Sequence, residues 1–214
     1  MAILTMIAGE TGTGKTASLR NSLERMSLIN VAGKPLPFRG KCEKVFNCDE
    51  APKIITALKA ATSDIIVLDD VQYIMAHAFF RRRAEKGYDK FADIGGAIFD
   101  LIKAAELLPE HKRVYFLWHT EQTDFGKIKA KTLGKMLDDK LVVEGEFSIV
   151  LRTMVQDGHY YFRTRNDGND NVKSPMGMFR TELIDNDLEQ VDQAICAYYE
   201  IERDNDKPAD KKTK

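Results

Sequence analysis

A glycine-rich segment near the N-terminus has the residue types and the spacing of a loop that binds phosphate. Residues 9–16 read GETGTGKT and fit the pattern G-x-x-x-x-G-K-[ST]. Glycines at these positions let the backbone curl, so that successive N–H groups point at a phosphate group. Lys15 would then bridge the β- and γ-phosphates of a nucleoside triphosphate, and the hydroxyl of Thr16 would ligate Mg²⁺. The predicted nucleotide-binding residues are Gly9, Glu10, Thr11, Gly12, Thr13, Gly14, Lys15, Thr16 and Ala17.

A second chemical signal is a carboxylate at the end of an apolar run. Residues 65–68 read IIVL and predict a buried strand, which Asp69 follows. In a parallel sheet the carboxyl ends of the strands face the nucleotide, so an aspartate there holds Mg²⁺ through water. Many buried strands end in aspartate, and the signal gains its meaning from the glycine-rich segment upstream. We expect Asp69 on the metal side, with Asp70 as its neighbour.

Hydrolysis also needs a group that orients or deprotonates the attacking water. Glu50 ends the second predicted strand region, where a carboxylate would lie over the γ-phosphate. The alternative is a helix N-terminal charge just before Pro52. His119 ends the predicted strand at 114–118 and is a candidate sensor of the γ-phosphate. A histidine that merely satisfies its hydrogen bonds at a strand end is the alternative for that position.

These residues need a scaffold, and the chain alternates between predicted strands and helices. Such alternation implies an α/β fold, with a mainly parallel sheet covered by helices on both faces. The last helix is predicted to begin at Asn186, with Glu189 completing a capping box. Strands are expected at residues 3–8, 44–47, 65–68, 114–118, 147–151 and 159–164, and the other helices at 15–29, 52–61 and 91–108.

Length and composition indicate one folded domain. The chain has 214 residues, of which 43% are hydrophobic and 30% charged, enough to bury a core. Residues 1–202 are assigned to the domain; residues 203–214, with eight charged residues in twelve, to a disordered tail. The three cysteines lack CxxC spacing, which favours reduced thiols in the cytoplasm over a zinc site. No run approaches the ~20 apolar residues of a membrane helix, and the apolar opening lacks the basic region and cleavage site of a signal peptide.

Several motifs together resemble one protein family. GETGTGKT, IIVLDD, KTLGKMLDDKLVVEGEFSIVLRT, YYFRTRNDG and KSPMGMF are similar to segments of compact phage-encoded RecA-like ATPases of single-strand annealing and recombination. The resemblance covers roughly residues 1–183. It implies a RecA-like core with a C-terminal β-hairpin and helix, ATP with Mg²⁺ as ligand, and single-stranded DNA as partner. It also implies work beside a single-strand-binding protein in the cytoplasm of a bacterial host.

The resemblance also suggests roles for the candidate catalytic groups. It carries the catalytic carboxylate onto Glu50 and the γ-phosphate sensor onto His119. One departure concerns Asp70, which stands where many members of the family have serine. The general base therefore remains open between Glu50 and Asp70.

RecA-like proteins hold DNA with two loops that follow the third and fourth strands. Here the corresponding regions are residues 79–86 and 125–131, each of which combines cations with an aromatic residue. This combination suits phosphate neutralisation and base stacking, whereas an ordinary solvated basic stretch is the alternative. The net charge of −1 gives no support of its own. The candidate DNA contacts are Arg81, Arg82, Arg83, Lys127, Lys129 and Lys131.

In RecA-like ATPases the nucleotide usually lies between subunits, and a neighbour supplies a cation to the γ-phosphate. The resemblance therefore implies a homo-oligomer, either a ring or a filament. Arg163 and Arg165 alternate on a late predicted strand and share one side of it, with Lys173 shortly after. The alternative for these cations is an edge hairpin on which charge discourages aggregation.

Two other classes of function fit the same residues. A small phosphate-loop kinase would need an acceptor pocket, and single-stranded DNA would not stimulate its ATP turnover. A nucleotide-gated loader or adaptor would bind ATP with little hydrolysis. ATP turnover with and without single-stranded DNA separates these two classes from a DNA-stimulated ATPase.

Overall fold

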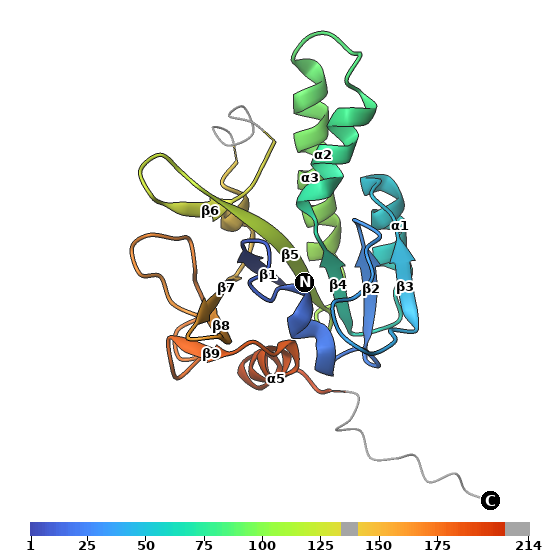
Figure 1. Cartoon of the computed structure of the whole chain (residues 1–214). Coiled ribbons are helices and arrows are strands. Elements are labelled where there is room, and N and C mark those ends of the chain that lie inside the picture. The colour runs from blue at the N-terminus through green and yellow to red at the C-terminus, as the bar shows by residue number, and fades with distance from the viewer. Residues whose placement is uncertain (134–140, 204–214) are drawn as a thin grey trace, which may run out of the picture.

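The computed structural model describes residues 1–133 and 141–203, which form an α/β fold around one mixed, mostly parallel sheet (Figure 1). The strand order is β3-β2-β4-β5-β1-β7-β8-β9, and β6 pairs with β5 beside this path. The first six strands of this order are mutually parallel, whereas β8, β9 and β6 join antiparallel. The bounds are β1 Ile3–Gly9, β2 Met26–Asn30, β3 Lys44–Asn47, β4 Ile65–Asp69, β5 Arg113–Gln122, β6 Ile128–Ala130, β7 Ile149–Gln156, β8 His159–Arg163 and β9 Leu183–Asp185.

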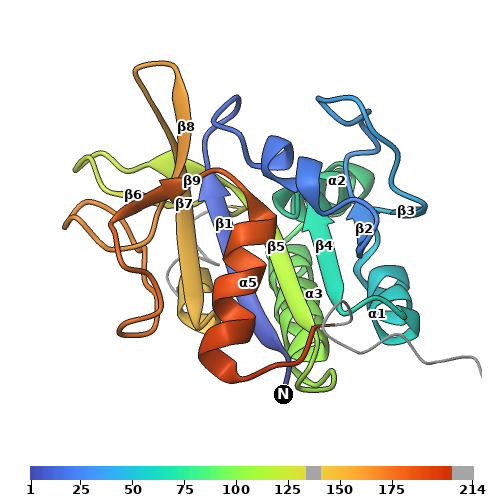
Figure 2. The ribbon, with the colours of Figure 1, turned by 90° about the horizontal axis from the view of Figure 1, so that it is seen from below.

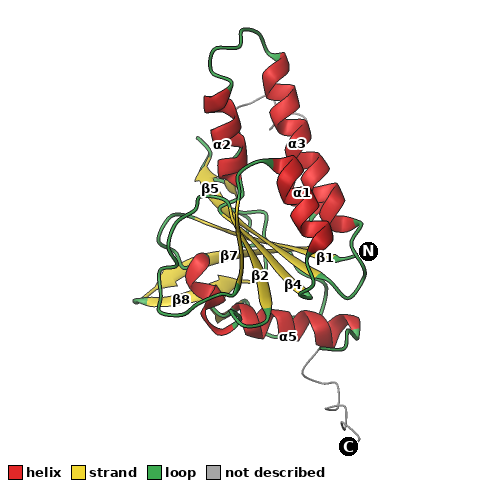
Figure 3. Cartoon of the chain, turned by 90° about the vertical axis from the view of Figure 1, so that its right-hand side faces the viewer, coloured by secondary structure: helices red, strands yellow, loops and turns green. Residues whose placement is uncertain are grey.

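Helices cover both faces of the sheet, as the alternating pattern predicts (Figures 2 and 3). On one face, α1 (Ala51–Ala60), α2 (Gln72–Arg81) and α3 (Asp89–Glu106) contribute to one apolar core. On the other face, the 3₁₀ helix η1 (Thr16–Asn21) and α5 (Leu188–Tyr199) form a second core. A further 3₁₀ turn, η2, spans Val143–Glu146. The helices α2 and α3 lie side by side and extend beyond the sheet (Figure 3).

The predicted helix over residues 15–29 is wrong. The chain instead forms the six-residue helix η1, turns, and enters the strand β2. The spacing of apolar residues in this region fits the period of a helix as well as that of a strand, because Leu19 and Met26 belong to the same core although they lie on different elements. The strand wins because β2 lies between β3 and β4, where Leu28 and Ile29 are buried on opposite faces. Parallel strands covered on both faces are apolar throughout and lose the alternation that marks a strand.

Most other predicted elements are confirmed. The helix α2, directly after β4, and the short strands β6 and β9 are not among the elements expected from the sequence. The final helix begins one residue later than predicted, since its N-cap is Asp187, whose side chain accepts a hydrogen bond from the backbone N–H of Glu189. Arg203, the first residue of the predicted tail, forms ion pairs with Glu189 and Asp192 of α5. The remainder of that tail, residues 204–214, lies outside the described residues. Among the residues that the structure describes, no helix is long and apolar enough to cross a membrane.

A buried ion pair attaches α5 to the central strand β5. Arg113, 1% exposed, donates from Nε and Nη2 to the two carboxylate oxygens of Asp192 at 2.9 and 3.1 Å. Asp192 is 0% exposed and also accepts a hydrogen bond of 2.8 Å from the hydroxyl of Tyr115. Burial of the ring, and after it the charge of Asp192, raises the pKa of Tyr115 well above its ordinary value. The third nitrogen of the guanidinium, Nη1, donates to the carbonyl oxygen of His111 at 2.6 Å, so the buried group has a partner for each nitrogen.

Replacing Asp192 by alanine should destabilise the protein strongly. The change removes the hydrogen-bonded counter-ion of the buried Arg113 guanidinium and leaves it only Asp64, at 4.0 Å; such a loss is worth about 3–5 kcal/mol in comparable sites. Urea unfolding followed by circular dichroism measures the free energy of unfolding. The matched control is Asp100→Ala on α3, an exposed aspartate. Equal unfolding midpoints for the two variants would contradict the role given to the pair.

Candidate functional site

The glycine-rich loop, Asp69, Asp70 and His119 meet at the carboxyl edge of the parallel sheet, as predicted from the sequence. Strand β5 lies between β1 and β4 in the sheet. Its register places His119 opposite Gly9, where the glycine-rich loop of residues 9–16 begins. On the other side, β4 ends at Asp69. The loop, the histidine and the acidic pair Asp69 and Asp70 therefore share one edge.

A cleft of about 530 Å³ opens above this edge. The glycine-rich loop contributes to it, together with residues of β4, β5, β8, α2 and the segment between β2 and β3. Lys34, Tyr73 and Tyr160 are not among the site residues predicted from the sequence, although Tyr160 opens the YYFRTRNDG segment. The lining residues are Thr11, Gly12, Gly14, Lys15, Thr16, Ala17, Lys34, Pro35, Pro37, Asp69, Asp70, Tyr73, His119 and Tyr160.

The glycine-rich loop has a conformation that requires its glycines. Gly12 and Gly14 have φ angles of +82° and +98°, in the region that side chains disfavour. A Cβ atom at Gly9 would lie 1.8 Å from the hydroxyl of Thr153 on β7, so the loop also passes too close to its neighbour for any other residue. That same hydroxyl lies 2.6 Å from the hydroxyl of Thr13. The loop is thereby held against the sheet.

Lys15 is folded back onto the loop that carries it. Its side chain is buried, and its ammonium group donates hydrogen bonds to the carbonyl oxygens of Gly9 and Glu10 at 2.9 and 2.8 Å. Burial lowers the pKa of Lys15 to about 8, against the opposing effect of the charges on Asp70 and Asp69. The hydrogen bonds of the ammonium group thus go to neutral carbonyls, and an anion entering the cleft would favour its charged form.

Thr16 and Asp69 bring two kinds of oxygen to one point. The hydroxyl of Thr16 lies 3.0 Å from both carboxylate oxygens of Asp69. Burial, and after it the charge of Asp70, raises the pKa of Asp69 to about 6. The described residues contain no cluster of three or more histidine, cysteine or acidic side chains suited to a metal. Thr16 and Asp69 fit a Mg²⁺ ion that takes its other ligands from phosphate and water, as this cation usually does.

Asp70 has the opposite electrostatic character. Its carboxylate contacts Nε2 of His119 at 2.9 Å and accepts a hydrogen bond of 3.0 Å from the ammonium group of Lys34. Burial alone would raise the pKa of Asp70, but the hydrogen bonds with His119 and Lys34 outweigh it and hold the pKa at about 2. Its φ of +63° is unusual for a residue with a side chain and aims the carboxylate at these partners. A carboxylate of such low proton affinity is a weak base and a strong positioning group.

Glu50 does not line the cleft. It is the N-cap of α1 and its carboxylate pairs with Lys53 at 2.5 Å, which is the helix-terminal alternative raised from the sequence. The strand that it follows, β3, is the outermost strand, and β2 separates it from β4. His119, by contrast, lies between Thr11 and Asp70, with Nδ1 at 3.3 Å from the Thr11 hydroxyl.

The late cations predicted for a neighbouring site have different environments. Arg163 pairs with Asp167 at 3.2 Å, and Arg165 donates to the backbone carbonyl oxygens of Phe179 and Arg180. Lys173 is exposed and its backbone bridges to Val150. The strand β8 that carries Arg163 lies between β7 and β9, so it is not the edge strand considered from the sequence.

The predicted DNA cations fall into two groups. Two of the three arginines are neutralised within the chain: Arg81 contacts Asp49 at 2.7 Å, and Arg82 contacts Glu85 and Asp93. Arg83 donates only to a backbone carbonyl oxygen. Lys129 pairs with Glu121 at 3.2 Å. Lys127 and Lys131 are exposed and form no ion pair within the described residues.

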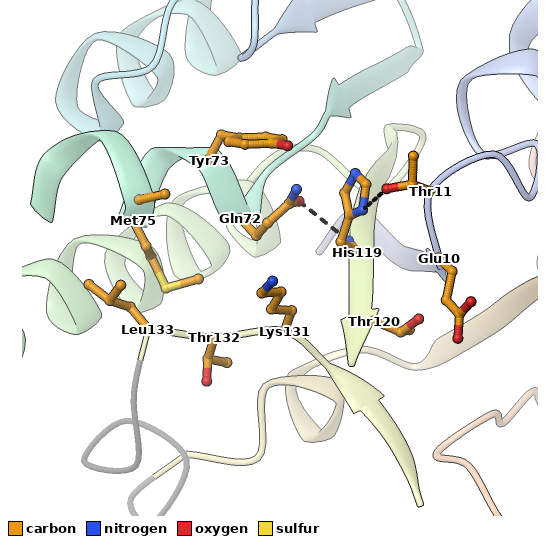
Figure 4. A pocket seen from close by; sticks show the side chains of 11 residues that line it. Glu10, Thr11, Gln72, Tyr73, Met75, His119, Thr120, Lys131, Thr132 and Leu133 are labelled. Atoms are coloured by element: carbon orange, nitrogen blue, oxygen red, sulfur yellow. Dashed lines mark hydrogen bonds between the residues drawn. The ribbon is translucent and has the colours of Figure 1, made fainter. Parts of the chain in front are cut away.

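A second cavity, of about 420 Å³, adjoins the cleft (Figure 4). The two share Thr11, Tyr73 and His119. In Figure 4 the side chain of Lys131 lies among Gln72, His119 and Thr120. His119 therefore stands between the cleft and this cavity. The remaining lining residues are Glu10, Met75, Ala76, Thr132 and Leu133.

No protein-family model matches the chain, and no curated protein sequence matches it. The function of the site is consequently inferred from its residues and their geometry.

Replacing Asp69 by asparagine should stabilise the nucleotide-free, Mg²⁺-free protein at pH 7. The pKa of Asp69 is about 6 in the folded protein and near 3.8 in the unfolded chain, so the folded state binds more protons. Its contribution to stability is complete below pH ~4 and is lost as the pH rises through 6. The asparagine variant should gain roughly 2–3 kcal/mol at pH 7 and nothing below pH 4. Urea unfolding across this range measures the difference, with the exposed Asp124→Asn as control; a pH-independent difference would contradict the assignment.

Proposed function

We propose that the chain is a RecA-like phosphate-loop ATPase that acts on single-stranded DNA in phage recombination or strand annealing. The observation that carries the nucleotide part is the contact of Thr16 with Asp69, which joins the glycine-rich loop to the end of β4. A hydroxyl and a carboxylate at one point, beside a buried lysine ammonium, are the groups that a Mg²⁺-nucleotide needs. The GETGTGKT motif supplies the lysine and the hydroxyl at the spacing expected for that ligand, and β4 supplies the carboxylate of Asp69.

Each group has a separate role in this proposal. Lys15 exchanges its carbonyl partners for the oxygens of the β- and γ-phosphates, and the backbone N–H groups of residues 9–16 hold the β-phosphate. Thr16 and Asp69 would hold Mg²⁺, which would supply positive charge beside the phosphates. In this proposal His119, held by Asp70, senses the γ-phosphate and orients the attacking water. We assign Asp70 to the positioning of His119 and Lys34, in preference to the role of general base.

The DNA part of the proposal is supported by cations beside an exposed ring. Phe125 is 99% exposed at the turn between β5 and β6, with Lys127 next to it. Cations neutralise the phosphates of a single strand and an exposed ring stacks on its bases. A homo-oligomeric ring or filament and a single-strand-binding partner complete the proposal. Of the late cations, Arg165 and Lys173 are exposed, and these two are the candidates to reach the γ-phosphate bound by a neighbouring subunit.

A kinase is the second candidate, because the cavity shown in Figure 4 adjoins the cleft where a phosphate acceptor would enter. ATP turnover measured with and without single-stranded DNA distinguishes the two. Stimulation by DNA supports the recombination protein, whereas a DNA-independent rate that requires an added small acceptor supports the kinase. A nucleotide-gated adaptor would bind ATP and show negligible turnover in either assay.

Lys15→Ala should abolish turnover and leave the fold intact. The ammonium group contacts loop carbonyls and not the apolar cores, so its loss removes phosphate stabilisation without opening a core. We expect the ATPase rate to fall by at least about 10²-fold, as for the loss of other groups that stabilise transition-state charge. Turnover and thermal melting are measured in parallel, with the exposed Lys41→Ala as control. Near-normal turnover in a folded Lys15→Ala protein would disprove the nucleotide assignment.

The double variant Lys127→Ala, Lys131→Ala should bind single-stranded DNA with a weaker dependence on salt. Removing one cation that neutralises a phosphate should reduce the slope of log K against log salt concentration by about 0.7, and removing two should reduce it by about 1.4. Fluorescence anisotropy of a labelled oligonucleotide at several salt concentrations measures the slope.

Arg82→Ala is the matched control for this measurement, because Glu85 and Asp93 already neutralise that arginine. Its slope should equal that of the parent protein. A slope unchanged in the double variant would place the DNA contact elsewhere on the chain.

A further inference from the structure

One wall of the cleft carries an aromatic ring for which the proposed hydrolysis has no use. Tyr160 lies near the start of β8 and is 49% exposed. It lines the same cleft as Lys15, Thr16 and Asp69. Figure 2 shows the β7–β8 hairpin on one side of the glycine-rich loop and the segment between β2 and β3 on the other. Tyr160 and the prolines Pro35 and Pro37 thus line the cleft from these two sides of the loop.

The backbone of Tyr160 is held firmly, although its ring is exposed. The residue pairs with Val155 on β7, and its carbonyl oxygen accepts a hydrogen bond of 3.2 Å from the backbone N–H of Asn186. Alternation along β8 places its side chain on the same face as Phe162, which is buried in the core beneath η1 and α5. The ring therefore stands on the face of the sheet where η1 follows the glycine-rich loop.

The ring also touches the loop itself. Its Cδ1 atom lies 2.9 Å from the position that a Cβ atom would take on Gly14, so the ring packs directly against the loop backbone. A nucleotide whose phosphates occupy that loop would have its sugar and base within reach of the ring. The glycine at this position leaves room for both the ring and the ligand.

The other tyrosine of the cleft is already engaged. The ring of Tyr73 has the ammonium group of Lys34 4.7 Å from its centre and meets His119 edge to face at 6.0 Å. Tyr160, in contrast, takes part in no ring–ring or cation–ring contact within residues 1–133 and 141–203. The end of the cleft near Tyr73 is polar and occupied by the ionic contacts of Asp70, which suits phosphate. The Tyr160 end offers an open aromatic face and a second wall of proline.

We propose that Tyr160 is the platform on which the nucleobase stacks, opposite the prolines of the segment between β2 and β3. The inference rests on the proposed binding of a nucleoside triphosphate, and it adds a base subsite to the phosphate site. Stacking on a tyrosine uses the π-face that every base has, so Tyr160 contributes affinity for nucleotides over inorganic phosphates.

The test compares a nucleotide with its phosphate chain alone. Isothermal titration calorimetry measures the dissociation constants of Mg²⁺-ATP and Mg²⁺-tripolyphosphate for the full chain and for Tyr160→Ala, Tyr160→Phe and Tyr198→Ala. Tyr198 is 43% exposed on α5 and does not line the cleft, which makes it a matched control. Thermal melting verifies that each variant is folded.

The Tyr160→Ala change should weaken ATP binding about 5- to 100-fold and tripolyphosphate binding less than about twofold. Tyr160→Phe, which keeps the ring, should bind both probes like the parent, as should Tyr198→Ala. Equal losses for ATP and tripolyphosphate would overturn the inference, since the ring would then act only through the shape of the loop. Unchanged ATP binding in Tyr160→Ala would also overturn it. Failure of the nucleotide proposal itself has a different signature, because the parent chain would then bind neither probe.

Discussion

The parallel pairing of β5 between β1 and β4 is the constraint on which the site depends. Strand β5 is buried on both faces along residues 113–118, so its register against both neighbours is fixed by the two cores. That register brings the start of the glycine-rich loop, His119 and the acidic pair to one edge. A slip of one residue would turn His119 to the opposite face and remove it from Asp70. The positions of the side chains at this edge are thus fixed by the packing of the buried part of β5 in the two cores.

Two neighbouring aspartates have pKa values on opposite sides of their ordinary value. Burial raises the pKa of Asp69 to about 6, whereas hydrogen bonds with His119 and Lys34 overcome burial and hold that of Asp70 at about 2. The negative charge of Asp70 contributes to the shift of Asp69, so the two cannot be tuned separately. A nearby cation would therefore stabilise the charged form of Asp69, whereas the carboxylate of Asp70 already has His119 and Lys34 as partners. This division is the electrostatic basis for assigning the metal to Asp69.

The sequence predicts the loop, Asp69 and most of the strands because their signals are local. It fails at β2, where an apolar run fits a helix and a strand equally well. The error extends to Glu50, which is predicted to lie over the γ-phosphate as the end of the second strand, although β2 separates that strand from β4. Ion pairs such as that of Arg81 with Asp49 join residues far apart in the chain. Composition alone therefore does not show whether the arginines of a cluster are free to bind DNA or are already paired with carboxylates. Tyr160 opens the YYFRTRNDG segment, but nothing in that segment predicts a place in the cleft, since only the fold brings β8 to the loop.

The helix α2 starts directly after the acidic pair and ends at Arg81, close to the tip that projects beyond the sheet. A ten-residue helix is about 15 Å long and stiff. Because the helix is stiff, a change at one of its ends is transmitted to the other: over that length, a rotation of about 10° at Asp70 would displace Arg81 by roughly 2.6 Å. The ion pair of Arg81 with Asp49 joins the far end of α2 to the turn between β3 and α1. Through α2 and this ion pair, the backbone at Asp69 and Asp70 is connected to β3, the outermost strand of the sheet.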